Sequence, residues 1–290
     1  MLMDVSVAFP NLGIEFQNLG KSITIFGIEI AFYGMIIAFG MVMGYLVAAW
    51  QAKRTGQNPD VYLDFAIWAI ILSVLGARLY YVIFNWSYYI ENPGQIFNFR
   101  NGGLAIYGGV IVAIATAYVY TRVKKISFWL LADTGVLGLI IGQAIGRWGN
   151  FFNREAFGDY TNSFFAMQLK KSEVAASNIT QNMLDNIKTI DAVEYIQVHP
   201  TFLYESVWNL VLLIGLIIYS KHKRFEGEII LLYLVGYGVG RLWIEGLRTD
   251  QLLIWGTNIA VSQAVSVVGI VIGITLIILK RRKVSSAKAA

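Results

Sequence analysis

The chain of 290 residues is 57% hydrophobic and only 14% charged, with a mean hydropathy of +0.58. A soluble domain carries about a quarter charged residues, so this composition argues against a soluble protein and predicts one embedded in lipid. The net charge of +5 does not indicate nucleic acid, because the basic residues form short runs between apolar stretches. The absence of cysteine excludes disulfides and thiolate metal sites, and two histidines do not suffice for a histidine-rich metal site.

Seven stretches are long and apolar enough to span a bilayer, which takes about 20 residues. In chain order we predict spans near residues 24–50, 61–85, 104–121, 127–146, 200–220, 227–247 and 258–279. The predicted fold is an all-α integral membrane protein in which residues 1–290 form a single transmembrane domain. We expect no cleavable signal peptide before the first span, because residues 1–20 lack a basic segment followed by a compact apolar core. Small residues four apart, such as Gly40/Gly44 and Gly138/Gly142, predict close helix packing.

Basic residues follow every second span. They are Lys53 and Arg54; Arg122, Lys124 and Lys125; Lys221, Lys223 and Arg224; and Lys280, Arg281, Arg282, Lys283 and Lys288. The positive-inside rule predicts that these segments are cytoplasmic, with the N-terminus outside and the C-terminus in the cytoplasm. The one long connection, residues 148–198, then lies outside, and its mixed polar sequence predicts a small external lobe between spans four and five.

Polar and ionisable side chains recur at one depth in the predicted spans. Such residues are costly inside a membrane and are usually functional. On five helices they fall in the outer half of the predicted membrane: Arg78, Tyr107, Arg147, His199, Tyr204, Glu205, Arg241 and Glu245. Asp133 is the exception and falls nearer the inner half. The convergence of five helices predicts a polar site that opens toward the outer face.

Helical spacing groups some of these residues. One face of the sixth span carries Tyr237, Arg241, Glu245 and Arg248. If the fourth helix continues past residue 146, Arg147, Asn150 and Arg154 share another face. The cations within the spans are all arginine, which stays charged when desolvated and binds phosphate oxygens with two parallel hydrogen bonds. The acids at this depth do not match the cations in number, so we expect an anionic ligand, with a phospholipid headgroup as the candidate.

Several of these residues also have a structural interpretation. Arg241 and Glu245 could neutralise each other and join two helices. Arg78 could extend its charge to the membrane interface. His199 precedes Pro200 at a helix start and could orient that helix. Arg147 lies in a turn rich in glycine and asparagine, where a purely structural arginine is less expected, so its functional interpretation is favoured.

A family resemblance begins at GRWGNFFNREAFG, residues 146–158. This segment resembles the signature of the prolipoprotein diacylglyceryl transferases. Further matching motifs cover most of the chain in the same order: the Tyr33–Gly34 pair, NGGLAIYGG (101–109), LAD (131–133), HPTFLYE (199–205) and GYGVGRLWIEGLR (236–248). Residues 160–197 carry no recognisable motif.

The resemblance implies a bacterial plasma-membrane enzyme whose active site faces the outer leaflet. Its partners would be phosphatidylglycerol, the signal peptide of a prolipoprotein with its lipobox cysteine, and membrane lipid, with no nucleic acid. The diacylglyceryl group would pass from phosphatidylglycerol to the cysteine thiol, with release of glycerol 1-phosphate. By motif match and depth, we expect catalytic roles for Arg147, Arg241, Tyr107 and Glu155. We expect substrate-binding roles for Tyr33, Asn150, Gly158, Tyr237, Glu245, Arg78 and His199, and neither a cofactor nor a metal.

Tyr107 departs from the family pattern, because many members carry a histidine at this position, often considered the base that takes the thiol proton. A tyrosine titrates near 10, so Tyr107 would serve as a base only if neighbouring cations lowered its pKa strongly. A role in orienting the substrate is the favoured hypothesis, and both roles stay open.

Two other functions compete with lipid transfer. A lipid transporter or flippase would predict internal repeats and polar residues in both leaflets, and neither is evident. A scaffold that binds anionic lipid without chemistry would use the same arginines, so the sequence leaves it open.

Overall fold

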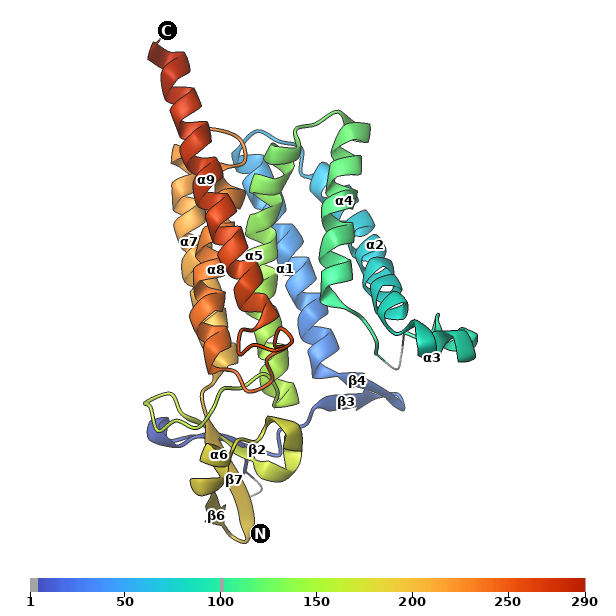
Figure 1. Cartoon of the computed structure of the whole chain (residues 1–290), viewed down its shortest axis with the longest axis vertical. Coiled ribbons are helices and arrows are strands. Elements are labelled where there is room, and N and C mark those ends of the chain that lie inside the picture. The colour runs from blue at the N-terminus through green and yellow to red at the C-terminus, as the bar shows by residue number, and fades with distance from the viewer. Residues whose placement is uncertain (1–4, 100–101, 290) are drawn as a thin grey trace. The chain divides into compact units, whose positions relative to one another are not determined.

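The computed structural model describes residues 5–99 and 102–289 and is mostly helical (Figure 1). Within these ranges seven helices are long and apolar enough to cross a membrane. They are α1 (Phe32–Arg54), α2 (Asp60–Phe84), α4 (Ile106–Lys124), α5 (Phe128–Asn153), α7 (Thr201–Tyr219), α8 (Glu228–Leu247) and α9 (Val261–Ala289). Each of the seven predicted spans corresponds to one of these helices. Asn101 and the side chain of Lys288, which belong to the sequence predictions, lie outside the described part.

The chain forms two compact units. Unit 1 comprises residues 1–44 and 137–290, and unit 2 comprises residues 45–136, so α1 and α5 each contribute to both. The prediction of a single transmembrane domain stays a prediction.

In unit 2, α2 packs antiparallel against α4. Glycine permits the close approach at one end, where a Cβ on Gly76 would lie 3.0 Å from the carbonyl oxygen of Gly108. At the other end the Tyr120 hydroxyl donates to the carbonyl of Val61 at 3.0 Å. Between α2 and α4 the chain forms the short helices α3 (Trp86–Glu91) and η2 (Pro93–Gln95).

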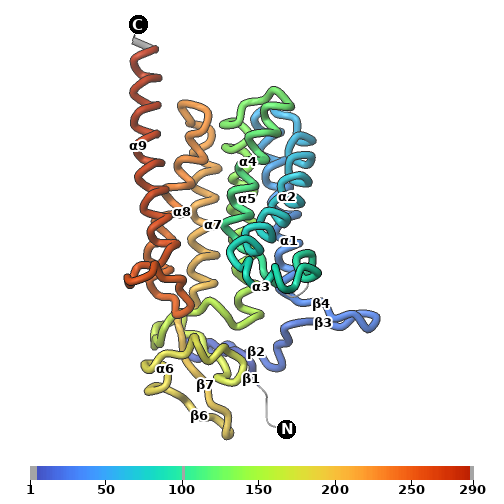
Figure 2. The backbone as a smooth tube through the Cα atoms, turned by 45° about the vertical axis from the view of Figure 1, so that its right-hand side comes forward, coloured from blue at the N-terminus to red at the C-terminus, as the bar shows by residue number. Residues whose placement is uncertain are grey.

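The helices of unit 1 also meet through small residues. A Cβ on Gly44 of α1 would lie 2.9 Å from the Gly138 oxygen of α5, and one on Gly40 would lie 3.3 Å from the Gly142 oxygen. The predicted role of these glycines in close packing is therefore confirmed. The helices α7, α8 and α9 lie side by side, as both views of the chain show (Figure 2).

A five-stranded antiparallel sheet in unit 1 has the strand order β2-β1-β5-β7-β6. Its strands are β1 (Val5–Phe9), β2 (Ile14–Gln17), β5 (Met167–Lys170), β6 (Lys188–Ile190) and β7 (Val193–Val198), accompanied by the short helix α6 (Gln181–Asp185). We call residues 5–17 and 158–198 the β-lobe. The all-α prediction is therefore too narrow. The strands are short and β1 pairs with a segment some 160 residues later in the chain, so no local pattern revealed the sheet.

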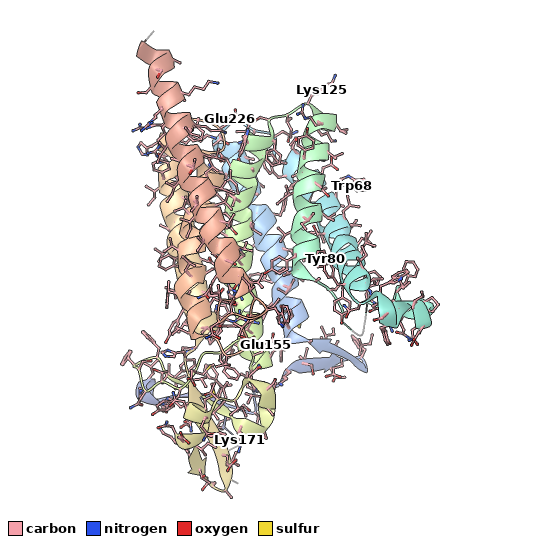
Figure 3. All side chains as sticks on the ribbon, viewed as in Figure 1. Trp68, Tyr80, Lys125, Glu155, Lys171 and Glu226 are labelled. Carbon is pink, nitrogen blue, oxygen red and sulfur yellow. The ribbon has the colours of Figure 1, made fainter. Side chains whose placement is uncertain are left out.

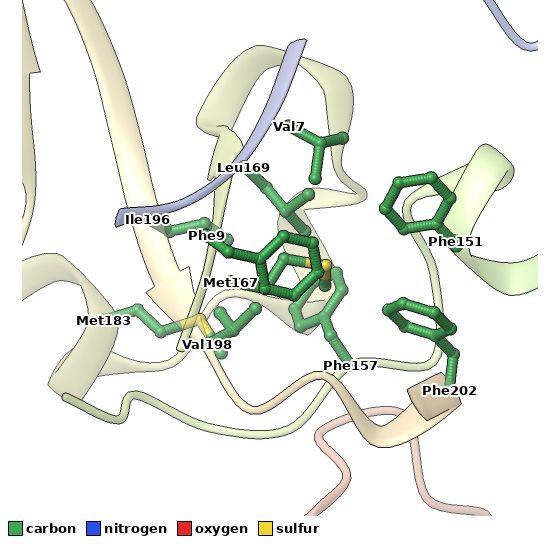
Figure 4. Close-up of a cluster of buried hydrophobic side chains, with 10 residues drawn as sticks. All are labelled: Val7, Phe9, Phe151, Phe157, Met167, Leu169, Met183, Ile196, Val198 and Phe202. Carbon is green, nitrogen blue, oxygen red and sulfur yellow. The ribbon is translucent and has the colours of Figure 1, made fainter. Parts of the chain in front are cut away.

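The β-lobe shares a hydrophobic core with the helices of unit 1 (Figure 4). The buried cluster consists of Val7, Phe9, Phe151, Phe157, Met167, Leu169, Met183, Ile196, Val198 and Phe202. Phe151 comes from the last turn of α5 and Phe202 from the first turn of α7, and their rings lie 5.0 Å apart. The lobe is thus fixed to the two helix ends that carry Arg147 and Glu205.

The first predicted span began too early, because residues 22–31 form a β-hairpin before α1. Its strands are β3 (Ser22–Ile25) and β4 (Ile28–Ala31), and its turn places Phe26 and Gly27 at φ 50° and 78°. Two positive φ values are typical of the tight turns that suit hairpins. The isoleucines made this segment hydrophobic enough to join the predicted helix, although β-branched residues favour strands.

Candidate active site

Five charged side chains meet where α5 ends, α7 begins and α8 ends. Glu205 of α7 lies at the centre, with Oε2 2.8 Å from Arg147 Nη2 and Oε1 2.8 Å from Arg241 Nη1. Arg241 also pairs with Glu245 one turn later on α8. Arg248 Nη1 lies 3.6 Å from Glu245 Oε2 and 4.0 Å from Glu205 Oε1. We call these five residues the arginine–glutamate cluster.

The cluster corrects one expectation, since its arginines have matching acids. Three guanidinium groups face two buried carboxylates, and Arg248 also holds Asp250 through hydrogen bonds of 2.9 and 2.8 Å. Burial alone would lower the pKa of Arg248. The hydrogen bonds and charge of Asp250, together with the charges of Glu245 and Glu205, outweigh burial and raise that pKa. The pairing of Arg241 with Glu245, predicted as the structural alternative, is confirmed.

Arg147 is the arginine of the cluster with the most capacity for a ligand. Its side chain is 22% exposed, compared with 12% for Arg241 and 14% for Arg248. Within the described residues its one ion pair uses Nη2, and a guanidinium has five N–H donors. Arg147 therefore has donors left for an anion.

Glu205 was not among the predicted catalytic or binding residues. The sequence did contain one indication of its role, because Glu205 is the only charged residue of α7. A lone carboxylate in a spanning helix needs a cationic partner. The sequence located Glu205 at the depth of the arginines but did not show that it bridges two of them.

The end of α5 brings two further predicted residues together. Asn150 Nδ2 donates to Glu155 Oε1 at 3.0 Å, and Asn153 Nδ2 donates to the same oxygen at 3.2 Å. The chain reverses here because Arg154 and Ala156 adopt φ values of 57° and 56°. Figure 3 shows Glu155 between the end of α5 and the β-lobe.

Arg154 does not continue the predicted stripe of Arg147 and Asn150, since α5 ends at Asn153. Its guanidinium is buried and lies 2.5 Å from Glu173 of the β-lobe. It also donates to the backbone carbonyls of Phe152, at 2.8 Å, and Leu19. Arg154 thus anchors the β-lobe to the end of α5.

Gly158 and His199 join the ends of three helices through the backbone. Gly158 N donates to His199 O, His199 N donates to Asp159 O, and Asp159 N donates to Leu247 O, each at 3.0 Å. A Cβ on Gly158 would lie 2.8 Å from the Leu247 oxygen, so only glycine fits. The His199 ring lies 3.3 Å from the Tyr204 hydroxyl. Burial lowers the pKa of His199, and the charge of Asp159 opposes this only in part.

Two predicted tyrosines each pack against a neighbour in unit 1, Tyr33 at a helix end and Tyr237 in the middle of α8. Tyr33, in the first turn of α1, lies against Gly149 of α5, where an added Cβ would be 2.6 Å from a ring carbon of the tyrosine. The Tyr237 ring stacks on Tyr233 with centroids 5.3 Å apart, one turn before Arg241.

In unit 2, Arg78 is surrounded by backbone carbonyls of the loop that follows α2. It donates to the backbone carbonyls of Gln95 at 2.5 Å, Ile96 at 2.8 Å, and Gly102 and Gly103 at 2.9 Å each. The residue is 5% exposed, and its charge is held by loop carbonyls. Its extension to the membrane interface stays a prediction. Arg78 lines a cavity of about 290 Å³, and its role in substrate binding stays a prediction.

Tyr107 also belongs to unit 2 and lies in the first turn of α4, which begins at Ile106. The next residue, Gly108, packs against the Tyr80 side chain. Tyr107 is partly exposed, as an orienting residue or a base would need to be.

The chain matches the sequence model of a family described as prolipoprotein diacylglyceryl transferase over residues 21–279. The chain belongs to this family. It is 45% identical over 235 residues to the phosphatidylglycerol–prolipoprotein diacylglyceryl transferase of Clostridioides difficile (strain 630), which covers 81% of this chain and 84% of that protein. The protein of the same name from Lysinibacillus sphaericus (strain C3-41) is 43% identical over 248 residues, covering 86% and 87% of the two chains.

Membership of the prolipoprotein diacylglyceryl transferase family confirms the resemblance found in the sequence. The matched region contains every predicted catalytic and binding residue, including Tyr33 near its start and Glu245 near its end. Within the described ranges no group of three or more histidine, aspartate or glutamate side chains could hold a metal ion. The independence of the reaction from metal stays a prediction.

Proposed function

We propose that this protein transfers the diacylglyceryl group of phosphatidylglycerol to the thiol of the lipobox cysteine in prolipoproteins. The cysteine sulfur forms a bond to the terminal glycerol carbon, and the bond from that carbon to the phosphate oxygen breaks. The thiol proton passes to solvent, and the phosphate departs as glycerol 1-phosphate. Within the family, the observation that carries this proposal is the convergence around Glu205 of Arg147 and Arg241, inside spanning helices, and of Arg248, directly after α8.

The cluster suits the departure of a phosphate monoester. Negative charge grows on the phosphate as the carbon–oxygen bond breaks, and fixed cations in a site of low dielectric constant stabilise that charge. Arg147 has donors available for the phosphate. Glu205 holds Arg147 and Arg241 close together before the lipid arrives, each at 2.8 Å from one of its oxygens. The phosphate then competes with Glu205 for these two guanidinium groups.

The attacking group must be a thiolate, and a free cysteine titrates near 8.5. Neighbouring guanidinium charges favour the anionic form and lower the pKa of the thiol. The assignment of Tyr107 as an orienting hydroxyl is compatible with this, because the thiol then needs no strong base. Glu155, held by Asn150 and Asn153, is assigned to the same site by motif.

We assign the end of unit 1 that carries the β-lobe to the outer face of the membrane. At the opposite end, Arg281 of α9 donates to Glu228 and to the Tyr219 hydroxyl at 2.7 Å each, so the basic segments after α7 and α9 adjoin. The positive-inside rule supports a cytoplasmic position for this end. Single cysteines at Ser177 in the β-lobe and at Lys223 can be labelled with an impermeant reagent, since the chain has no cysteine of its own. Labelling of position 177 from the cytoplasmic side only would contradict this orientation.

The activity is tested with purified protein, phosphatidylglycerol micelles and a lipobox peptide. We expect the peptide mass to increase by one diacylglyceryl group, and no increase for a control peptide whose cysteine is serine. A lipid scaffold or a flippase would bind or move the lipid and leave the peptide mass unchanged. That result, with correctly folded protein, would refute the proposed transfer.

A further inference from the structure

A second polar layer lies one to two helical turns from the arginine–glutamate cluster, toward the middle of the spans. It consists of Gln143, Asn209, Tyr233 and Tyr237. Gln143 comes four residues before Arg147 on α5, Asn209 four after Glu205 on α7, and Tyr237 four before Arg241 on α8. Because α7 runs opposite to α5 and α8, all three steps lead in the same direction. Four residues of helix rise about 6 Å.

Contacts connect the members of the layer across helices. Gln143 Nε2 donates to the Tyr233 hydroxyl at 2.9 Å, and that hydroxyl lies 3.3 Å from Gln143 Oε1. Tyr233 in turn stacks on Tyr237. The Gln143 side chain is partly exposed, and its amide has a second N–H that bonds no residue in the described part of the chain.

The side-chain amide of Asn209 is buried and lacks a hydrogen-bond acceptor in the ranges that the structure describes. The residue is 1% exposed, and its Nδ2 has no hydrogen-bond partner among the described residues. It borders a gap together with Glu205, Tyr237 and Arg241, so the unpaired amide adjoins the cluster. The gap has no room for a water molecule in this structure, so a lipid carbonyl reaches Asn209 only when the gap widens. A buried donor without a partner is costly, and a hydrogen bond from a bound molecule would remove that cost.

The chemistry of the layer differs from that of the cluster. The cluster is charged and suits a phosphate, whereas the layer offers neutral N–H and O–H donors, which suit neutral carbonyl oxygens. In a diacyl phospholipid the neutral carbonyls are the two acyl esters. They are joined to the phosphate through the glycerol backbone and lie deeper in the membrane than the phosphate. The order of the two groups along the lipid matches the order of cluster and layer along the helices.

We propose that Gln143 and Asn209 bind the acyl ester carbonyls of the lipid donor while the cluster binds its phosphate. This inference rests on the proposed function, which supplies the lipid. The two contacts hold the glycerol backbone at both ends and thereby fix the position of the carbon that the thiolate attacks. Polar residues that merely join helices would make no distinction between lipids with and without ester carbonyls.

The test compares ester-linked phosphatidylglycerol with its ether-linked analogue of equal chain length, which lacks the carbonyl oxygens. Binding is measured by native mass spectrometry and transfer by the mass of the lipobox peptide. A neutral hydrogen bond changes affinity by about three- to tenfold, so the unmodified protein should prefer the ester lipid by about that factor. Gln143→Leu and Asn209→Leu should each lower binding of the ester lipid and leave binding of the ether lipid unchanged. In each variant, the ratio of the affinities for the ester and the ether lipid should therefore decrease toward one.

Gln51→Leu is the matched control, because it makes the same chemical change in α1, within unit 2. It should keep the ester preference. Equal binding of both lipids by the unmodified protein would overturn the inference, and so would an equal loss for both lipids in Gln143→Leu. If the ester preference is present but no peptide is modified, the proposed transfer fails while the ester contact stands.

Discussion

Glu205 Oε1 accepts a hydrogen bond from Arg241 Nη1 at 2.8 Å and thereby joins the start of α7 to the last turns of α8. The other carboxylate oxygen lies 2.8 Å from Arg147 on α5. One buried acid therefore sets the separation of two arginines from different helices. Removing one partner of a buried ion pair is strongly destabilising, since the remaining charge loses its compensation.

Glu205→Gln should lower both stability and activity. The substitution keeps the shape of the side chain but removes the charge that holds Arg147 and Arg241 together. We expect a loss of about 3–5 kcal/mol in stability, the magnitude for a broken buried pair, and at least a tenfold decrease in kcat/KM. Thermal unfolding and the peptide assay measure the two effects. Glu194→Gln, at an exposed carboxylate paired with Lys171, is the control and should change neither. Normal turnover by Glu205→Gln would show that the bridge is dispensable.

Arg147→Lys and Arg241→Lys test the phosphate contact. Lysine keeps the charge but lacks the planar fork that binds two oxygens at once. Each variant should lose at least about tenfold in kcat/KM, equivalent to about 1.4 kcal/mol. Arg282→Lys, at an exposed arginine of α9, is the control. If both variants retain full activity at ordinary lipid concentrations, neither arginine holds the phosphate.

Gly149→Ala should displace Tyr33, because the new Cβ would lie 2.6 Å from a carbon of the tyrosine ring. We expect a marked loss of transfer, since Tyr33 is a predicted binding residue. Gly135→Ala on the same helix meets nothing within 4 Å and should stabilise the protein by about 1 kcal/mol through helix propensity. Kinetics and thermal unfolding of this pair separate the displaced ring from the general effect of glycine. Equal activity in the two variants would refute the role of Tyr33.

The burial of His199 predicts a pH dependence of stability. Its pKa is lowered in the folded state from an ordinary value of 6.5, so the unfolded chain binds the proton more tightly. Stability should therefore decrease as the pH falls below about 6.5 and level off below the folded pKa. His199→Gln should remove this component, whereas His222→Gln should keep it. Thermal unfolding between pH 5 and 8 measures the effect, and an unchanged profile in His199→Gln would assign it elsewhere.

Hydropathy and charge were sufficient to predict the seven spans, because lipid imposes long apolar helices that a window of sequence detects. They were not sufficient at residues 24–31, where isoleucines give the same hydropathy in a strand as in a helix. The β-lobe sheet also escaped prediction. Its central pairing joins Val7 to Leu169, and such distant partners leave no local periodicity.

The sequence predicted most residues of the site but not which of them form ion pairs across helices. Spacing placed Arg241 and Glu245 on one face of a helix, and the structure pairs them. Spacing within one helix does not show which side chain of another helix faces that pair, so the bridge through Glu205 required the fold. Arg154 was misplaced for a related reason. Arg154 ends α5 because its backbone is left-handed, with φ 57°. Nothing in the sequence indicates that an arginine adopts this conformation here.

Tyr107 is the position at which the family resemblance implied a histidine in many members, and it carries the last prediction. Tyr107 lies in the first turn of α4 and is partly exposed. Gly108 and Gly109, which follow it, pack against α2 and therefore do not leave the backbone open to a substrate. If the hydroxyl orients the lipid or the thiol, Tyr107→Phe removes one hydrogen bond and should lower kcat/KM moderately, by about three- to tenfold. The pH profile of the rate should then stay governed by the substrate thiol, with the same inflection in both proteins.

A base at Tyr107 would behave differently, because its own ionisation would enter the profile. In that case Tyr107→Phe would abolish turnover, and Tyr107→His would restore it with a new inflection near 6.5, the ordinary value for histidine. Tyr80→Phe, one of the aromatic residues on α2, is the matched control for loss of a tyrosine hydroxyl in unit 2. The measurement is kcat/KM for the lipobox peptide between pH 6 and 9. Restoration by histidine together with the new inflection would make Tyr107 the base and refute the orienting role.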